Sequence, residues 1–274
     1  MNLSFTPVTE KLGVRVDGCD LRKPLDDATI SLLRKKMHHH GLLLFRDQDL
    51  TDEQQLRFAL IFGKISKQGP IQKVAPDITF VSNTRSDGTF GKGELSFHSD
   101  QCYYAHPMKA IMLYGLDVPT AGGETLFVNM AEVVESMPDA LRRELSHLKV
   151  RHELDYGLLD YGSEMKKNVE PSVIAAEHPV IAKHPWSEQM VLMSNTYTAR
   201  TIVGASSERS TQILRQLDEL VSDPQRVYRH QWKKGDLLVW DNLLLQHARS
   251  AFDPSETRTL RRCAIGNEQE AVAA

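Results

Sequence analysis

Three side chains suited to binding a metal ion lie far apart in this sequence, and bringing them together is the strongest constraint on the fold. His98 and Asp100 stand two positions apart. On an extended backbone, side chains two residues apart point to the same side. A third candidate, His247, follows much later in the chain. Two imidazoles and one carboxylate are the ligands of a facial-triad ferrous site, which leaves coordination positions open. Such a site requires a closed fold that returns the chain to His98.

The spacing of His98 and Asp100 has a simpler explanation when it is considered alone. A chain with 11 histidines contains such pairs by chance. An ordinary His–Asp hydrogen bond at an exposed strand end would account for this one. The adjacent histidines 38–40 point in three directions on a helix, so they cannot share one ion, and we expect them to be cations at a helix end. The hypothesis of a metal site therefore depends on the residues that follow His247.

Length and charge indicate an ordinary globular protein and exclude two classes of partner. The 274 residues are 41% hydrophobic and 25% charged, and this length fits one domain of the larger all-β kind. We therefore expect a single domain over residues 1–274. The net charge of −3 provides no basic surface for a phosphate backbone, so no nucleic-acid partner is expected. No apolar run approaches the roughly 20 residues that cross a bilayer, so no membrane partner is expected either.

The N-terminus and the cysteines predict a cytoplasmic location. Residues 1–7 have neither a basic segment nor an apolar one, so they do not resemble a signal peptide. Cys19, Cys102 and Cys263 are odd in number and lack the close spacing of a zinc site. Scattered cysteines of this kind favour a reducing compartment over a disulfide framework.

Helices are predicted early in the chain. Acidic residues at 26–27 suit the first turn of a helix that Gly41 would end. Thr51-x-x-Gln54 is a capping box for a second helix, which Gly63 would end. Asn129 can cap a third helix, whose apolar period continues to Leu148, and a further helix is expected from 206 or 207.

Short strands fill much of the remaining sequence. They are expected at 42–45, 78–81, 109–118, 124–128, 190–193, 227–230, 237–240 and 260–265. Residues 155–185 are the least regular, so we expect an irregular insertion around 155–205. The later strands follow one another without helices between them, which argues against a doubly wound α/β fold. The pattern predicts a mainly β protein with inserted helices, built on a double-stranded β-helix, the jelly-roll or cupin-like barrel.

Three further residues stand in a regular order with the candidate ligands, which gives the series His98, Asp100, Thr125, His247, Arg258 and Arg262. This series resembles the pattern H-x-D … T … H-x10-R, with a further Arg four residues on, of the TauD/TfdA family of Fe(II)- and 2-oxoglutarate-dependent dioxygenases. The stretches 121–125 and 240–242 also resemble the family's motifs. The resemblance extends over roughly residues 12–266. Six functional positions in the right order are far more specific than any single motif.

This resemblance implies the cofactors and the ligands. His98, Asp100 and His247 would bind Fe(II) as the metal ligands and catalytic residues. The cosubstrate 2-oxoglutarate would chelate the iron, and O2 would then bind. Arg258 would meet the distal carboxylate of 2-oxoglutarate, because its planar guanidinium suits a bidentate carboxylate, and Thr125 would add a donor. The products of cosubstrate oxidation would be succinate and CO2.

The resemblance also implies an anionic substrate. Arg262 matches the position that binds the anionic group of the substrate in relatives that act on taurine or aryloxyacetates. We expect a small organic anion, such as a carboxylate or sulfonate, to be oxidised, in most cases by hydroxylation. Related halogenases lack the carboxylate of Asp100, so its presence favours hydroxylation or desaturation. Gln72, Tyr103 and Asn195 are further candidates for substrate contact. The family suggests a homo-oligomer, either a dimer or a tetramer.

Two other functions fit part of the pattern. A jelly-roll metal enzyme could be an isomerase or hydrolase, but such chemistry needs no second carboxylate clamp at Arg258 and Thr125. A non-catalytic small-anion-binding jelly roll is the other alternative, although metal ligands are costly to bury without a metal. Demethylation of nucleic acid by iron chemistry is disfavoured by the acidic net charge.

Overall fold

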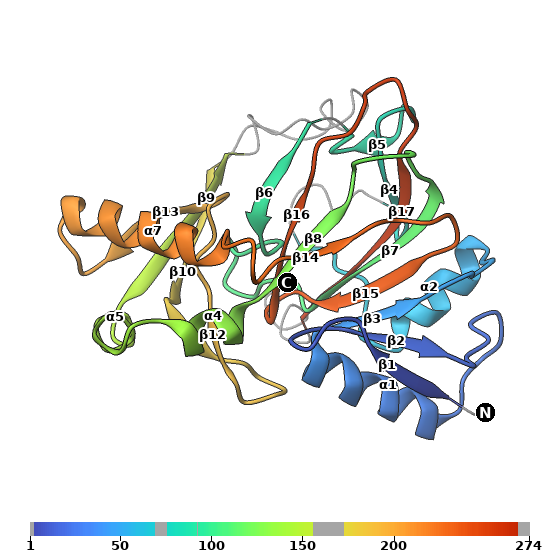
Figure 1. Cartoon of the computed structure of the whole chain (residues 1–274), viewed down its shortest axis with the longest axis horizontal. Helices are drawn as coiled ribbons and strands as arrows, with labels where there is room; N and C mark the ends of the chain where they lie inside the picture. Colours follow the sequence, from blue (N-terminus) through green and yellow to red (C-terminus); the bar gives the residue numbers. More distant parts are fainter. Residues whose placement is uncertain (1–2, 69–75, 92, 156–172, 268–274) are drawn as a thin grey trace.

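Two β-sheets that face each other carry the centre of the molecule. The computed structural model describes residues 3–68, 76–91, 93–155 and 173–267 (Figure 1). The larger sheet has, in spatial order, strands β1 (Ser4–Pro7), β2 (Val14–Asp17), β3 (Leu42–Phe45), β15 (Leu237–Asp241), β7 (Ala110–Asp117), β17 (Thr259–Ile265), β4 (Thr79–Ser82) and β5 (Gly88–Thr89). The smaller sheet has β14 (Tyr228–His230), β8 (Thr125–Asn129), β16 (Leu245–Arg249) and β6 (Leu95–His98).

Strands from distant parts of the sequence are neighbours in both sheets. The antiparallel partners of β7 are β15 and β17, and those of β16 are β8 and β6. This arrangement is the predicted jelly roll, and it closes the fold in the way that a site shared by His98 and His247 requires. The β16–β6 pairing places the Cα atoms of these two histidines opposite each other.

Successive side chains of a strand point to opposite faces of the sheet, and the two faces of the larger sheet carry two separate hydrophobic cores. In β7, Ile111 and Leu113 face the smaller sheet and pack in one core with Phe127 and Trp240. Their neighbours on the opposite face, such as Met112, form a second core beneath the N-terminal helices. Those helices, α1 (Asp27–His40) and α2 (Asp52–Leu60), cover the outer face of the larger sheet (Figure 1).

Local capping signals determine where these helices begin and end. The side chain of Asp26 accepts a hydrogen bond from the backbone N–H of Thr29, and Gly41 ends α1 in a left-handed conformation with φ of 78°. The predicted capping box of Thr51 and Gln54 is present at the start of α2. This helix ends at Leu60, before the glycine that we expected to end it.

A subsidiary layer of strands and helices lies beside the smaller sheet (Figure 1). It contains β9 (Lys149–Asp155), β10 (Val173–Pro179), β11 (Ile181–Lys183), β12 (Met190–Leu192), β13 (Ala199–Val203), α4 (Met130–Ser136), α5 (Asp139–Leu145) and α7 (Ser207–Val221). The expected caps are present, because the side chains of Asn129 and Ser206 accept hydrogen bonds from the first turns of α4 and α7.

Three expectations about secondary structure are wrong. The described part of the insertion, 173–205, is not irregular, because β10 pairs with β9 over seven residues and β13 pairs with the other edge of β9. The helical period after Asn129 is broken at Pro138, which separates α4 from α5. The strand β16, which carries His247, was not expected. In the described residues, no helix has both the length and the apolar character needed to cross a membrane.

The end of α1 provides a test of this packing. A Cβ atom at Gly41 would lie 2.8 Å from Cγ of Leu245, and the positive φ adds backbone strain. Gly93 has a similar φ of 70°, but no atom lies within 4 Å of its Cβ position. We expect Gly41→Ala to reduce the free energy of unfolding by about 3 kcal/mol and Gly93→Ala by about 1 kcal/mol. Urea denaturation measures both free energies of unfolding. Equal losses in the two variants would show that the close approach of Leu245 to Gly41 does not matter for stability.

Candidate metal centre and its cavity

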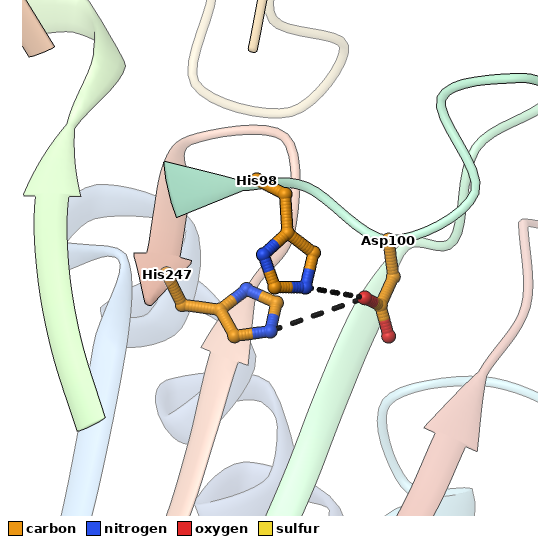
Figure 2. Close-up of side chains that lie close together, drawn as sticks. All are labelled: His98, Asp100 and His247. Atoms are coloured by element: carbon orange, nitrogen blue, oxygen red, sulfur yellow. Dashed lines mark ion pairs between the residues drawn. The ribbon is translucent and has the colours of Figure 1, made fainter. Parts of the chain in front are cut away.

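His98, Asp100 and His247 converge on one point (Figure 2). His98 is the last residue of β6, and His247 lies in the middle of β16. Oδ1 of Asp100 lies 3.3 Å from Nε2 of His98 and 3.9 Å from Nε2 of His247. The three possible ligand atoms all lie within 4.8 Å of one another, which is close enough for one ion to bind all three.

We expected Asp100 to lie on the same extended strand as His98, and this expectation is wrong. Strand β6 ends at His98, and Asp100 lies in the turn that follows it. The carboxamide of Asn242 holds this turn in place. Its Oδ1 accepts from the backbone N–H of Asp100 at 2.8 Å, and its Nδ2 donates to the carbonyl oxygens of Asp100 at 3.0 Å and Met108 at 2.9 Å. Asn242 is completely buried, so it fixes the backbone of Asp100 from inside the protein.

The protonation states of Asp100 and His247 suit a divalent ion. Burial raises the pKa of Asp100, but the hydrogen bond from His98 and the charges of Arg262 and His247 outweigh burial and hold that pKa far below its usual range. Burial lowers the pKa of His247 to about 3. Near neutral pH the aspartate is therefore ionised and His247 is neutral, and metal ligands require both states.

A backbone carbonyl orients the ring of His98. Nδ1 of His98 lies 2.7 Å from the carbonyl oxygen of Ser96. A carbonyl can only accept, so Nδ1 donates to it, and Nε2 is the ring nitrogen that remains for a metal ion. Two imidazoles and one carboxylate, with open space beside them, form a donor set that fits Fe(II).

The cluster opens into a cavity that four of the other predicted site residues line. Arg258, Thr125, Arg262 and Tyr103 all contribute to its wall, together with His98, Asp100 and His247. Asn195 does not line this cavity. Gln72 lies outside the described residues. The structure therefore brings seven of the nine predicted residues around one space.

Arg258 is a buried cation without an acidic partner in the described part of the chain. It is only 3% exposed, and its Nε donates to the carbonyl oxygen of Gly123 at 3.0 Å. Burial and the neighbouring charge of Arg249 lower its pKa to about 9. Gly123 permits this approach, because a Cβ atom there would lie 3.1 Å from Cδ of Arg258. A buried guanidinium at a cavity wall strongly favours an anionic ligand.

Arg262 has a partner, and that partner is a predicted metal ligand. Its Nη2 lies 2.6 Å from Oδ2 of Asp100, whereas Oδ1 is the oxygen paired with the two histidines. Arg262 lies in β17, whereas Arg258 precedes the first residue of that strand. The pairing of β17 with β7 is irregular between Thr259 and Leu260. Both arginines nevertheless line the same cavity.

Asn195 contributes to the site indirectly, through the turn that it holds. Its Oδ1 accepts hydrogen bonds from the backbone N–H and the hydroxyl of Thr198, both at 3.0 Å. This turn places Tyr197 and Thr198 in the cavity wall. The ring centroid of Tyr197 lies 5.5 Å from that of His98. Sequence analysis missed Tyr197, although the spacing Asn195-x-x-Thr198 is a local signal for such a turn.

Comparisons with known proteins agree with this geometry. The family model described as taurine catabolism dioxygenase TauD, TfdA family matches residues 4–264. Pentalenolactone F synthase from Streptomyces avermitilis is 30% identical, and the alignment covers 92% of this chain and 90% of that protein. The (S)-phenoxypropionate/alpha-ketoglutarate-dioxygenase from Sphingobium herbicidovorans is 28% identical, with 96% of this chain and 95% of the relative covered.

A solved structure shows the same architecture. The crystal structure of AAD-2 in complex with Mn(II) and N-oxalylglycine has a TM-score of 0.81 to this chain and is 28% identical to it. The similarity covers 98% of each chain. The expected jelly-roll fold is therefore confirmed.

The contacts of Asn242 predict an effect on metal affinity. Asn242→Ser would free the backbone of Asp100, and we expect Mn(II) binding to weaken roughly 10- to 100-fold, the usual effect of losing a group that supports a metal ligand. Gln55→Ser is a matched control, because it removes another completely buried amide, whose Nε2 donates to the carbonyl oxygen of Arg261 on the opposite face of the sheet. Calorimetry measures both affinities. A comparable loss in the control would show that general destabilisation, and not the support of Asp100, causes the effect.

Proposed function

We propose that this chain, which belongs to the taurine catabolism dioxygenase TauD, TfdA family, uses the cavity at His98, Asp100 and His247 to oxidise a small organic anion. The family's cofactors are Fe(II), 2-oxoglutarate and O2. The observation that carries the proposal is the buried guanidinium of Arg258, which shares a cavity with the three metal-ligand candidates and has no acidic partner in the described residues. A metal ion would bind to the three candidate ligands, and a dicarboxylate would reach from the metal to the guanidinium of Arg258.

Arg258 and Thr125 would hold the distal carboxylate of 2-oxoglutarate. The Nε of Arg258 is occupied by the carbonyl oxygen of Gly123, which leaves the two terminal nitrogens for a carboxylate. The ligand of AAD-2, N-oxalylglycine, is isosteric with 2-oxoglutarate. Its presence beside a metal in a protein of the same fold supports the cosubstrate.

The three ligands would leave one side of the iron open. When bound, Fe(II) with 2-oxoglutarate and O2 supplies the oxidising power, releasing succinate and CO2 and transferring one oxygen atom to a C–H bond of the substrate. The protein contributes orientation. Asn242 fixes the position of Asp100, and the carbonyl of Ser96 fixes the tautomer of His98. Because Asp100 would fill the third ligand position, the expected outcome is hydroxylation or desaturation, and hydroxylation is the first expectation.

The substrate would be an anion with an apolar body. Arg262 is the charged group nearest to the metal-ligand carboxylate, and only its Nη2 is engaged with Asp100. Tyr197, Leu154 and Met108 are among the residues that line the cavity, and they would contact apolar atoms of the substrate. A phenoxypropionate, the substrate type in the name of one relative, has this combination of a carboxylate and an apolar ring.

We also propose a cytoplasmic location and a dimeric or tetrameric assembly. All three cysteines are buried free thiols, which supports a reducing compartment.

The first test is a spectroscopic titration in the absence of oxygen. Fe(II) followed by 2-oxoglutarate should produce the visible charge-transfer band of a chelated 2-oxo acid. Arg258→Gln should require at least tenfold more 2-oxoglutarate for the same band, because it loses a bidentate charged contact. Arg209→Gln, which breaks a surface ion pair with Glu144, serves as the control and should behave as the unaltered protein. Iron binding without any band would reject the cosubstrate and favour a metal-dependent isomerase or hydrolase.

A second test separates the substrate from the cosubstrate. Arg262→Gln should retain the slow consumption of 2-oxoglutarate without substrate but lose at least tenfold of the stimulation by an anionic substrate, because the substrate loses its charged partner. Succinate release with and without phenoxypropionate, with Mn(II) affinity measured alongside, gives the result. Undiminished stimulation in the variant would show that Arg262 does not bind the substrate anion.

A further inference from the structure

The indole of Trp232 lies behind Thr125, on the side away from the cavity. Trp232 Nε1 donates a hydrogen bond to Thr125 Oγ1 over 2.9 Å, and both residues are buried. Thr125 lines the cavity that contains Arg258, whereas Trp232 does not line it. Trp232 can therefore influence a ligand in the cavity only through the residues in front of it.

The chemistry of the two groups determines the direction of this hydrogen bond. An indole N–H can only donate, whereas a threonine hydroxyl has one proton to donate and two lone pairs that can accept. Thr125 must therefore be the acceptor in its contact with Trp232. In the described part of the chain, no other hydrogen bond of Thr125 Oγ1 is recorded. The hydroxyl proton of Thr125 is consequently available for an acceptor in the cavity.

The indole is held rigidly in this position. The ring of His230 contacts it edge to face, with 4.7 Å between centroids and an interplanar angle of 87°. On another side, a Cβ atom at Gly115 would lie 3.4 Å from Cε3 of Trp232, so the backbone of β7 lies directly against the ring. The backbone N–H of Gly235 donates to the carbonyl oxygen of Gly115 at 2.9 Å, which ties the loop after Trp232 to the same strand.

We propose that Trp232 is a positioning residue, which aims the hydroxyl proton of Thr125 at the distal carboxylate of 2-oxoglutarate. This inference rests on the proposed function, because it assumes that 2-oxoglutarate occupies the cavity. Without the indole, the hydroxyl of Thr125 could adopt several orientations, and the binding of 2-oxoglutarate would have to restrict it to one. With the indole, the orientation exists before the cosubstrate arrives, and such preorganisation increases affinity.

The test uses the Mn(II)-loaded protein, in which calorimetry measures 2-oxoglutarate binding without turnover. Trp232→Phe keeps an aromatic ring and removes only the ring nitrogen and part of the indole. We expect it to weaken binding about fivefold, the usual range for one neutral hydrogen bond, and Thr125→Val to weaken binding about tenfold. The double variant should bind as Thr125→Val does, because Trp232 acts only through the hydroxyl. In the iron enzyme, Trp232→Phe should raise KM for 2-oxoglutarate and leave kcat unchanged.

A tryptophan outside the cavity provides the control. Trp186 stacks on His38 and does not line the cavity, so Trp186→Phe should bind 2-oxoglutarate as the unaltered protein does. The proposal is overturned if the Trp232→Phe variant binds 2-oxoglutarate as tightly as the unaltered protein does. It is also overturned if the effects of the two variants multiply in the double variant, which would indicate a packing role independent of Thr125. If the unaltered protein binds no 2-oxoglutarate, the proposed function itself fails, and this result is distinguishable from both.

Discussion

The antiparallel pairing of β16 with its two neighbours is the interaction on which the whole site depends. On one side, β6 brings His98 opposite His247. On the other side, β8 brings Thr125 opposite Arg249, two residues further along β16. One strand therefore aligns the candidate metal ligands with the part of the cavity that would hold the cosubstrate. A slip of one residue in this register would turn His247 to the other face of the sheet. The register of these backbone hydrogen bonds thus has a direct chemical consequence.

Charge in the cavity is arranged in two different ways. Arg262 is paired with Asp100, so the carboxylate that would bind the metal also has a cationic neighbour on its other oxygen. Arg258 is buried, and within the described residues its recorded side-chain contact is with a neutral carbonyl. A buried charge without a counter-ion is costly, and a bound anion relieves that cost. The cavity is consequently prepared for an anion at Arg258 even before any ligand enters, whereas Arg262 must share its charge between Asp100 and a substrate.

Signals that act over a few residues were readable from the sequence. The cap at Asp26, the left-handed Gly41 and the capping box at Thr51 are local hydrogen-bonding and steric effects, and the structure contains all three. Features that depend on distant pairing were harder to predict. The segment 173–205 lacks a strong period of its own, yet β10 and β13 form in it because β9 supplies their backbone partners. The position of Asp100 was derived from strand alternation, but Asn242, far along the chain, holds it in a turn.

The sequence by itself therefore determined which functional side chains are present and in what order they occur along the chain. His98, Asp100 and His247 have the donor atoms that a ferrous ion prefers, and Arg258 has the planar cation that suits a carboxylate, whatever the fold. Their mutual placement came from long-range contacts that no local pattern reveals. Only the assembled sheets show that Arg262 contacts Asp100 and that Trp232 stands behind Thr125. Side-chain chemistry belongs to each residue separately, whereas distance and hydrogen-bond direction arise when remote segments pack together.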